Sequence, residues 1–149
     1  MKTIVAAVDF SNSTPGVIEQ ACLLASAFSC DLHLLHVIEP EPSYTAYGFT
    51  PNEFPALHAY QQEAKRRAES KLNDLLTQTK IKLPATKAHV LEGSPLRCIA
   101  DHVGEIKADL LVLGSHGHGA IASLLLGSVA EGMVRRALVP TLVVPAPHA

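Results

Sequence analysis

The strongest indication of chemistry in this chain is a glycine-rich stretch between residues 113 and 129. Gly114 and Gly117 lie three residues apart, and nine further residues separate Gly117 from Gly127, which is followed by Ser128. An apolar run precedes the stretch, and a sequence that can form a helix follows it. Because glycine has no side chain to shield the backbone, this order brings bare N–H groups and a helix N-terminus to a ligand. The pattern predicts a phosphate-binding loop, and its alternative is a set of turn glycines with a helix cap.

The region around this stretch carries no positively charged side chain. Neither lysine nor arginine occurs between Lys107 and Arg135. The charge of a di- or triphosphate would therefore have to be met by backbone N–H groups, by the helix dipole and by the Ser128 hydroxyl. We expect a divalent cation, brought in with the nucleotide, to supply the remaining positive charge.

Catalysis of phosphate transfer requires a group that orients water or accepts a proton, together with positive charge near the phosphates. The candidates in this sequence are Asp9, Ser128, His116 and His118, without a neighbouring lysine or arginine. The sequence thus favours binding of a nucleotide over efficient turnover, and we assign no catalytic residue.

The histidines do not indicate a metal centre. His116 and His118 flank Gly117 with no third ligand nearby in the sequence, so one of them is a candidate phosphate contact rather than a zinc ligand. His33 and His36 are three residues apart in a predicted strand and therefore point to opposite faces, which prevents them from sharing a metal. We expect both to be hydrogen-bonded in the core or to lie at the strand edge.

The length of 149 residues is that of one domain with a core of its own. The formal net charge of −2 lacks the excess of lysine and arginine that is typical of nucleic-acid-binding proteins. No signal-peptide core is present, and no apolar run approaches the roughly eighteen residues of a membrane span. We therefore expect a cytoplasmic protein that binds neither nucleic acid nor membrane. Cys22, Cys30 and Cys98 form no CxxC pair and are expected to be reduced, buried thiols.

The hydrophobic pattern predicts five strands that alternate with four helices. Continuous rather than alternating hydrophobicity in the strands indicates burial on both faces of a parallel sheet. Pro15 and Pro95 suit the first turns of two helices, with Thr14 and Ser94 as their N-caps. This order predicts an α/β fold with right-handed crossovers and helices on both faces. The predicted strands are residues 3–8, 31–38, 86–91, 109–113 and 141–144, the predicted helices are residues 15–28, 56–80, 95–106 and 129–138, and the proline-rich residues 39–55 form a long loop.

Three separate pieces of sequence converge on one edge of the predicted sheet. In open parallel sheets, ligands bind beyond the carboxyl ends of the strands, at the point where the strand order reverses. Asp9 follows the first strand, Val37 closes the second, and the glycine-rich stretch follows the fourth. The Asp9 carboxylate could accept hydrogen bonds from ribose hydroxyls or could cap the following turn, and both alternatives remain open.

These motifs resemble the universal stress protein family, in its ATP-binding subgroup. The resemblance rests on Gly114-xx-Gly117, nine residues and Gly127-Ser128, on Asp9 after the first strand, and on Leu-Leu-His-Val-Ile at the end of the second. It extends over the whole chain, including residues 92–95 and 139–144. It implies an open five-stranded parallel sheet of order 3-2-1-4-5, which is Rossmann-like and similar to the adenine-nucleotide alpha hydrolases. It also implies a homodimer in which the last strands, Thr141–Val144, pair.

The resemblance further implies a bound ATP, AMP or ADP, with Mg or Mn accompanying the phosphates. It places adenine near Val37 and Leu113 and the ribose near Asp9 and the backbone of Ala7, where some family members have proline. It places the phosphates on Gly117, Gly127, Ser128 and Val129. The complete set of expected binding residues is Ala7, Asp9, Val37, Leu113, Gly114, His116, Gly117, Gly127, Ser128 and Val129.

Two functional hypotheses follow. In the first, the chain is a nucleotide-binding regulatory protein of the stress response, in which nucleotide occupancy changes the dimer or the loop at residues 44–49 and hence the affinity for an unidentified protein partner. In the second, it is a slow ATPase or a self-phosphorylating enzyme that uses the same pocket. A flavin or another nucleotide on the same fold is a third hypothesis, although few aromatic residues lie near this edge of the sheet.

Overall fold

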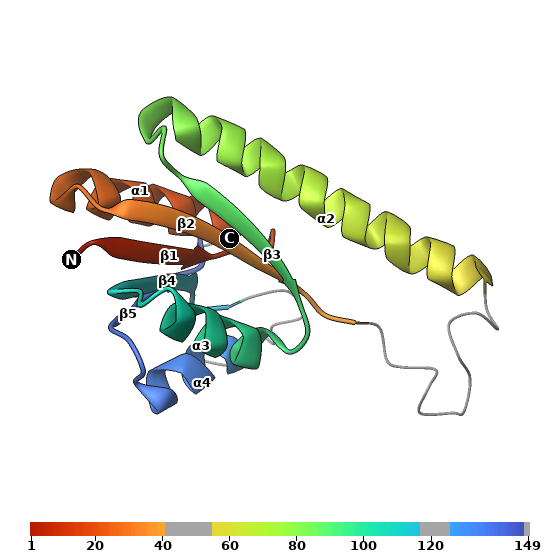
Figure 1. The fold of residues 1–149 in the computed structure, drawn as a ribbon. Coiled ribbons are helices and arrows are strands. Elements are labelled where there is room, and N and C mark those ends of the chain that lie inside the picture. Colours follow the sequence, from red (N-terminus) through yellow and green to blue (C-terminus); the bar gives the residue numbers. More distant parts are fainter. Residues whose placement is uncertain (41–54, 117–125, 148–149) are drawn as a thin grey trace.

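Five parallel strands form one sheet in the computed structural model, which describes residues 1–40, 55–116 and 126–147 (Figure 1). The strand order is β3-β2-β1-β4-β5, which confirms the order 3-2-1-4-5. Parallel pairing joins each strand to its neighbours, with β1 between β2 and β4. The strands are β1 (Thr3–Ala7), β2 (Asp31–Ile38), β3 (Lys87–Glu92), β4 (Leu110–Gly114) and β5 (Thr141–Val144).

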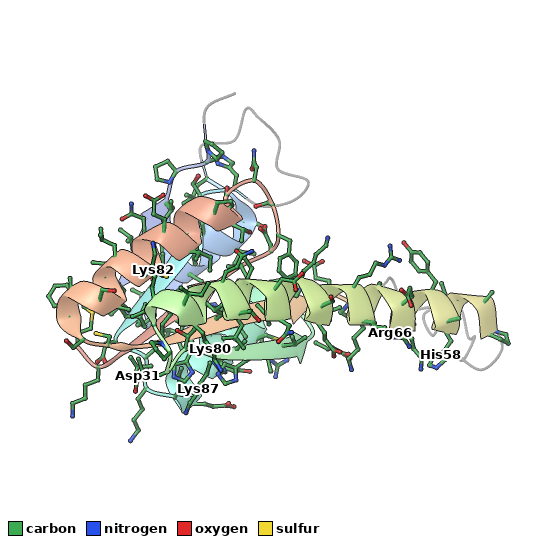
Figure 2. All side chains as sticks on the ribbon, turned by 90° about the horizontal axis from the view of Figure 1, so that it is seen from above. Asp31, His58, Arg66, Lys80, Lys82 and Lys87 are labelled. Carbon is green, nitrogen blue, oxygen red and sulfur yellow. The ribbon has the colours of Figure 1, made fainter. Side chains whose placement is uncertain are left out.

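Helices cover both faces of the sheet. They are α1 (Thr14–Phe28), α2 (Pro55–Lys82), α3 (Pro95–Glu105) and α4 (Ser128–Arg136). The first two lie on one face and the last two on the other (Figure 1). Viewed from above, the N-terminal half of α2 extends past the end of the sheet (Figure 2). The α/β fold with helices on both faces, expected from the alternation of strands and helices, is therefore confirmed.

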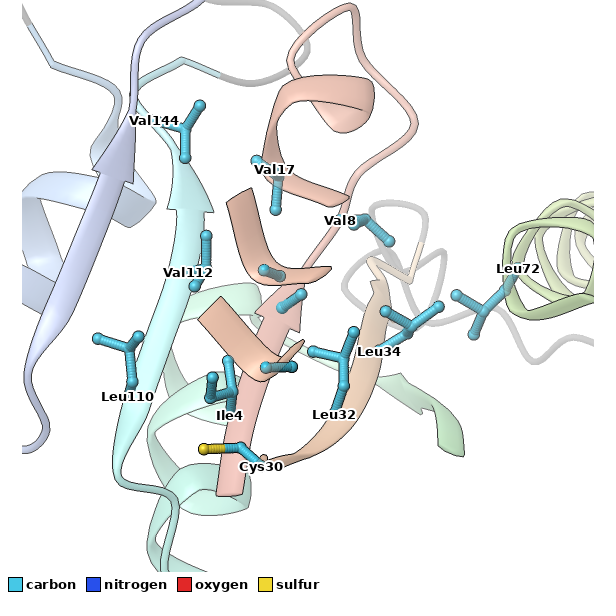
Figure 3. Close-up of a cluster of buried hydrophobic side chains, with 13 residues drawn as sticks. Ile4, Val8, Val17, Cys30, Leu32, Leu34, Leu72, Leu110, Val112 and Val144 are labelled. Carbon is cyan, nitrogen blue, oxygen red and sulfur yellow. The ribbon is translucent and has the colours of Figure 1, made fainter. Parts of the chain in front are cut away.

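The core has two parts, one on each side of the sheet. On the side of α1 and α2, Ile4 and Ala6 pack with Leu34 and with Leu72 of α2 (Figure 3). On the side of α3 and α4, Val5 belongs to a second cluster. Because successive side chains of a strand point to opposite faces, a strand buried on both faces must be apolar at every position. This is why the central strands are continuous apolar runs in the sequence.

The observed bounds of β2 and β5 equal the predicted ones, and those of the other elements differ from the prediction by at most two residues at either end. The clearest correction concerns the first helix, which begins at Thr14, so that Ser13 and not Thr14 is its N-cap. Neither Ser13 nor Ser94 makes a side-chain capping bond. Pro15 still lies in the first turn, where its missing N–H costs no helical hydrogen bond.

Asp109 directly precedes β4 instead of opening it, which corrects the predicted strand start. Its Oδ2 accepts hydrogen bonds from the backbone N–H groups of Lys2 and Thr3, at 2.7 and 2.9 Å. These bonds lower the pKa of Asp109 by stabilising the charged carboxylate. They fix the start of β1 against the start of β4.

Leu34 offers a test of the two-sided core. Its side chain has no exposed surface, so Leu34→Ala removes buried methyl groups and leaves a cavity. We expect the free energy of unfolding to fall by about 2–5 kcal/mol. The matched control is Leu23→Ala, at a leucine that is 63% exposed, which should change stability by less than about 0.5 kcal/mol. Urea unfolding measures both, and equal losses in the two variants would contradict the described core.

Candidate functional site

A cavity of about 540 Å³ opens at the carboxyl ends of β1, β2 and β4. Its lining comes from the ends of these three strands, from the first turns of α1, α3 and α4, and from two alanines of α2. The lining includes nine of the residues expected from the sequence to bind a ligand, namely Ala7, Asp9, Val37, Leu113, Gly114, His116, Gly127, Ser128 and Val129. The tenth, Gly117, lies outside the described residues. So do His118 and residues 44–49.

The sheet register explains why these residues meet. Ala7 is opposite Leu35 in the pairing of β1 with β2, and β1 also pairs with β4. The three strands run in the same direction, so the residues that follow them emerge at the same edge. Val37, Leu113 and Ile99 give this part of the cavity an apolar wall. An apolar wall with a few polar groups at one side suits a flat heterocycle that carries a polar substituent.

The start of α4 presents backbone N–H groups to the cavity. Gly127 is the N-cap of this helix, in an extended conformation with φ −70° and ψ 160°. It has no side chain to occupy the N–H groups of the first turn, which begins with Ser128 and Val129. The positive end of the helix dipole lies at the same place. This geometry is suited to an anion.

A chain of hydrogen bonds holds the end of β4 against the start of α4. The N–H of Gly127 donates to the carbonyl of Ser115 at 2.6 Å. The Ser115 hydroxyl lies 3.0 Å from Nδ1 of His116 and accepts a bond from the N–H of Ala146 at 3.1 Å. Ser115 thus links the two parts of the glycine-rich stretch to each other and to the chain after β5. The sequence pattern did not single out Ser115, because an isolated serine carries no signal of such a role.

Gly114 allows a close approach between β4 and the start of α1. A Cβ atom at this position would lie 2.9 Å from Cβ of Ser13 and 3.3 Å from the carbonyl oxygen of His116. The Ser13 hydroxyl donates to that carbonyl at 3.2 Å. The absence of a side chain at Gly114 is therefore required by its neighbours in the protein. Next to Ser13, the Thr14 hydroxyl is buried without a hydrogen-bond partner among the described residues.

Asp9 begins a tight turn at the edge of the cavity. Its Oδ1 accepts a hydrogen bond from the N–H of Ser11 at 3.0 Å, so the turn-capping alternative is observed, and the residue also lines the cavity. The next residue, Phe10, has a φ of 61°, in the left-handed region that non-glycine residues rarely adopt. Such strained turns persist when neighbouring contacts hold them.

His36 supplies those contacts. Its ring lies 4.4 Å from the ring of Phe10, centroid to centroid. Its Nδ1 is 2.8 Å from the carbonyl oxygen of Val8, and because a carbonyl only accepts, Nδ1 carries the proton. His36 also lines the cavity and is therefore a positioning residue for the turn at Asp9. The sequence predicted only that His36 would be hydrogen-bonded in the core or at the strand edge.

The described lining is negatively charged. It contains the carboxyl groups of Asp9 and Glu39 and no lysine or arginine. Residues 41–54 and 117–125 contain no lysine or arginine either, so they cannot supply one. The first lysine that follows Lys2 in the sequence is Lys65 of α2, and its Nζ forms an ion pair with Glu92 at 2.9 Å. A phosphorylated ligand would therefore meet backbone dipoles, histidines and hydroxyls, but no fixed cationic side chain in this lining.

Other chemistries were searched over the same described ranges. Within them, no cluster of three or more His, Cys, Asp or Glu residues has an arrangement that could hold a metal ion. Cys22, Cys30 and Cys98 are free cysteines, but of the three only Cys30 is buried; Cys22 and Cys98 are partly exposed, so the expectation that all three are buried was wrong. Among the helices of the described chain, none is long and apolar enough to cross a membrane.

Comparison with known proteins assigns the chain to a family. The family model described as "Universal stress protein family" matches residues 1–145. Universal stress protein A homolog 1 of Coxiella burnetii is 32% identical over 145 residues, which cover 96% of this chain and 95% of that protein. The chain belongs to the universal stress protein family. The expectation from the glycine spacing is confirmed at the level of the family.

Solved structures show the same fold. The universal stress protein UspA from Lactobacillus plantarum aligns with a TM-score of 0.83 at 21% identity, covering 96% of this chain and 97% of that one. A universal stress protein in complex with cAMP aligns at 0.68 and 24%, covering 98% of each chain. A family protein from Arabidopsis thaliana with AMP bound also aligns at 0.68, with 18% identity, covering 99% of this chain and 93% of that one.

Gly114 provides a test of the close approach between β4 and α1. We expect Gly114→Ala to lower the free energy of unfolding by about 1–3 kcal/mol, because the added methyl group meets Ser13 and the His116 carbonyl. The matched control is Gly104→Ala in α3, where a Cβ atom meets nothing within 4 Å. That change should leave stability equal or raise it by up to about 1 kcal/mol. Urea unfolding compares the two, and a Gly114→Ala protein as stable as the control would contradict the described packing.

Proposed function

We propose that this universal stress protein binds an adenine nucleotide in the cavity at the carboxyl ends of β1, β2 and β4 and acts as a nucleotide-dependent regulator. The observation that carries the proposal is that Asp9, Val37 and the glycine motif, far apart in the sequence, line one cavity together with the start of α4. Its volume of about 540 Å³ lies within the range of small-molecule sites. Relatives of the same fold with AMP or cAMP support this class of ligand.

The lining supports one orientation of the nucleotide. The adenine ring lies against the apolar wall of Val37 and Leu113, and the ribose hydroxyls face Asp9 and the backbone at Ala7. The phosphates extend toward Gly127 and the N–H groups of Ser128 and Val129, since the N–H of Gly127 itself is bound to the Ser115 carbonyl. Gly117 and His116 complete this side of the proposed site.

The negative lining has a consequence for the ligand charge. An AMP phosphate can be met by helix N–H groups alone, as at other helix N-termini. A triphosphate brings more charge beside Asp9 and Glu39 and needs a compensating cation. The proposed complex with ATP therefore contains Mg or Mn, whereas the complex with AMP does not depend on it.

The proposed regulatory output is assembly. β5 is the last strand of the sheet and pairs with β4 on one side. Its other edge presents backbone groups that a second copy of the chain can pair with, through Thr141–Val144. Leu138, 61% exposed just before β5, offers apolar area to such a homodimer. Nucleotide occupancy at the end of β4, the strand next to β5, would then alter the affinity for a protein partner.

Gly127→Val tests the phosphate position. The new side chain lies at the N-cap of α4, against the proposed phosphates, and should weaken the affinity for ATP with Mg at least about tenfold, or 1.4 kcal/mol. The extended φ and ψ of Gly127 are accessible to valine, so the fold should survive. The same substitution at Gly104, outside the cavity lining, is the matched control. Isothermal calorimetry that gives equal ATP affinity for wild type and Gly127→Val would disprove the phosphate assignment.

Removal of divalent cations tests the role of the negative lining. In EDTA, the affinity for ATP should fall about tenfold or more, whereas the affinity for AMP should change less than about threefold. Calorimetric titrations of both nucleotides, with Mg and with EDTA, measure the two ratios in the same protein. ATP that binds equally well in EDTA would show that the protein itself neutralises the triphosphate.

A further inference from the structure

Three histidines from three different elements meet on the α3 face of the sheet. They are His33 of β2, His89 of β3 and His102 of α3. Nδ1 of His33 lies 2.9 Å from Nε2 of His89, with the ring planes 8° apart and the centroids 5.2 Å apart. Because two nitrogens at 2.9 Å leave no room for face-to-face stacking, the rings meet edge to edge in an N–H···N hydrogen bond. Such a bond requires that one of the two nitrogens be unprotonated.

His102 completes the cluster from the helix. Its ring centroid lies 4.7 Å from that of His89, at an angle of 55°. The residue is 6% exposed, and its Nε2 is buried with no hydrogen-bond partner among the described residues. A proton on this buried nitrogen would find no acceptor there, so the charged form of His102 is costly.

The charged groups around the cluster do not compensate for burial. Lys87 of β3 lies opposite His33 in the strand register and adds positive charge, whereas Asp31 of β2 and Glu105 of α3 add negative charge. Burial is the largest effect on all three histidines, and it lowers the pKa of each below its ordinary value. Mutual repulsion of the three rings lowers the pKa of His33 and His89 further. The helices α1 and α2 cover the opposite face of the sheet (Figure 1).

The cluster lies behind one wall of the cavity. Leu35 follows His33 by two residues, on the same face of β2, and Ile99 precedes His102 by one turn of α3. Leu35 and Ile99 both line the cavity and belong to the same core cluster. Movement of α3 away from β2 and β3 would therefore displace part of the cavity wall.

We propose that His33, His89 and His102 form a proton-sensitive latch, which holds α3 against β2 and β3 at neutral pH and releases it on acidification. A second proton in the His33–His89 pair breaks their hydrogen bond, and a charge then lies beside the buried ring of His102. The proposed release of α3 does not depend on whether a ligand binds in the cavity. Its effect on nucleotide affinity rests on the proposed function.

The sign of the pH effect follows from the lowered pKa values. The unfolded chain takes up protons at these histidines below its ordinary pKa of about 6.5, whereas the folded chain does so only at lower pH. The stabilisation is therefore complete above about pH 6.5 and is lost as the pH falls through the folded-state values. Each extra proton bound by the unfolded state changes the unfolding constant about tenfold per pH unit.

Urea unfolding between pH 7.5 and 5.5 tests the latch in four proteins: wild type, His102→Phe, His89→Gln and His58→Gln. Phenylalanine keeps an aromatic ring at His102, and glutamine keeps a hydrogen-bonding group at His89. His58 is the matched control, an exposed histidine near the far end of α2 (Figure 2). We expect the unfolding constant of wild type to rise about tenfold or more as the pH falls from 7.5 to 5.5. In each cluster variant, this rise should be smaller by a factor of at least about three.

The outcomes are distinct. A full rise retained by His89→Gln, or by a folded His102→Phe, overturns the latch, as does an equal loss of the rise in His58→Gln. Amide hydrogen exchange then locates the effect: at pH 5.5, protection should fall first in α3, and a uniform loss over the whole sheet overturns the proposal. The affinity for AMP, measured at both pH values in wild type and in His89→Gln, tests whether release of α3 changes ligand binding. Protonation of AMP itself is common to both proteins and cancels in their ratio.

The two proposals fail in different ways. If AMP and ATP do not bind at pH 7.5, the proposed function fails while the exchange result still decides the latch. If AMP binds but its affinity falls equally with pH in wild type and in His89→Gln, the proposed effect of the latch on the cavity is wrong, while the proposal of nucleotide binding stands.

Discussion

Burial of β1 on both faces is the constraint on which the rest of the structure depends. Ile4, Val5 and Ala6 have no exposed surface, so helices must cover the sheet on both sides. The chain adds β2 and β3 on one side of β1 with α1 and α2 over one face, and then returns through α3 to place β4 on the other side. The strand order therefore reverses at β1. The connections on either side of this point diverge and leave the space in which the cavity lies.

The chemistry of that space differs from that of nucleotide sites built around a lysine. Among the described lining residues, the polar groups are backbone N–H groups at a helix start, hydroxyls and two histidines, and the charged groups are carboxylates. Such a lining can orient a nucleotide and can distinguish ligands by their phosphate charge. Its described part offers little fixed positive charge for a transition state.

Two histidines of β2 make different contacts because they lie on opposite faces of the sheet. His36 holds the turn at Val8 and Asp9, while His33 points to the opposite face and joins a cluster with His89. One residue thus supports the cavity from the side of the turn, and the other stands behind the wall formed by α3. The separation follows from their odd spacing in β2, since an odd number of residues along a strand changes the face.

Local signals in the sequence were sufficient for the element order and for a parallel sheet with helices on both faces, whereas the strand order came from the family resemblance. Apolar runs and helix-start prolines act over a few residues, and the rule for parallel crossovers converts their alternation into an α/β sheet. The glycine spacing carried the resemblance to the family and, with it, the strand order. The local signals placed the ends of the elements within one or two residues, with Thr14 mistaken for the N-cap that Ser13 provides. Together with the resemblance, they selected nine residues that line one cavity. The strand ends among them meet because residues that follow parallel strands emerge at the same edge.

Only the tertiary structure decided which side chains meet across elements. The contact of Gly114 with Ser13, the bond from Gly127 to Ser115 and the meeting of His89 with His33 and His102 all join distant segments. Each depends on strand register or on the rotation of a helix about its axis. Hydrophobic periodicity identifies the buried face of an element but does not set its offset along a neighbour, and the packing of the complete core determines that offset.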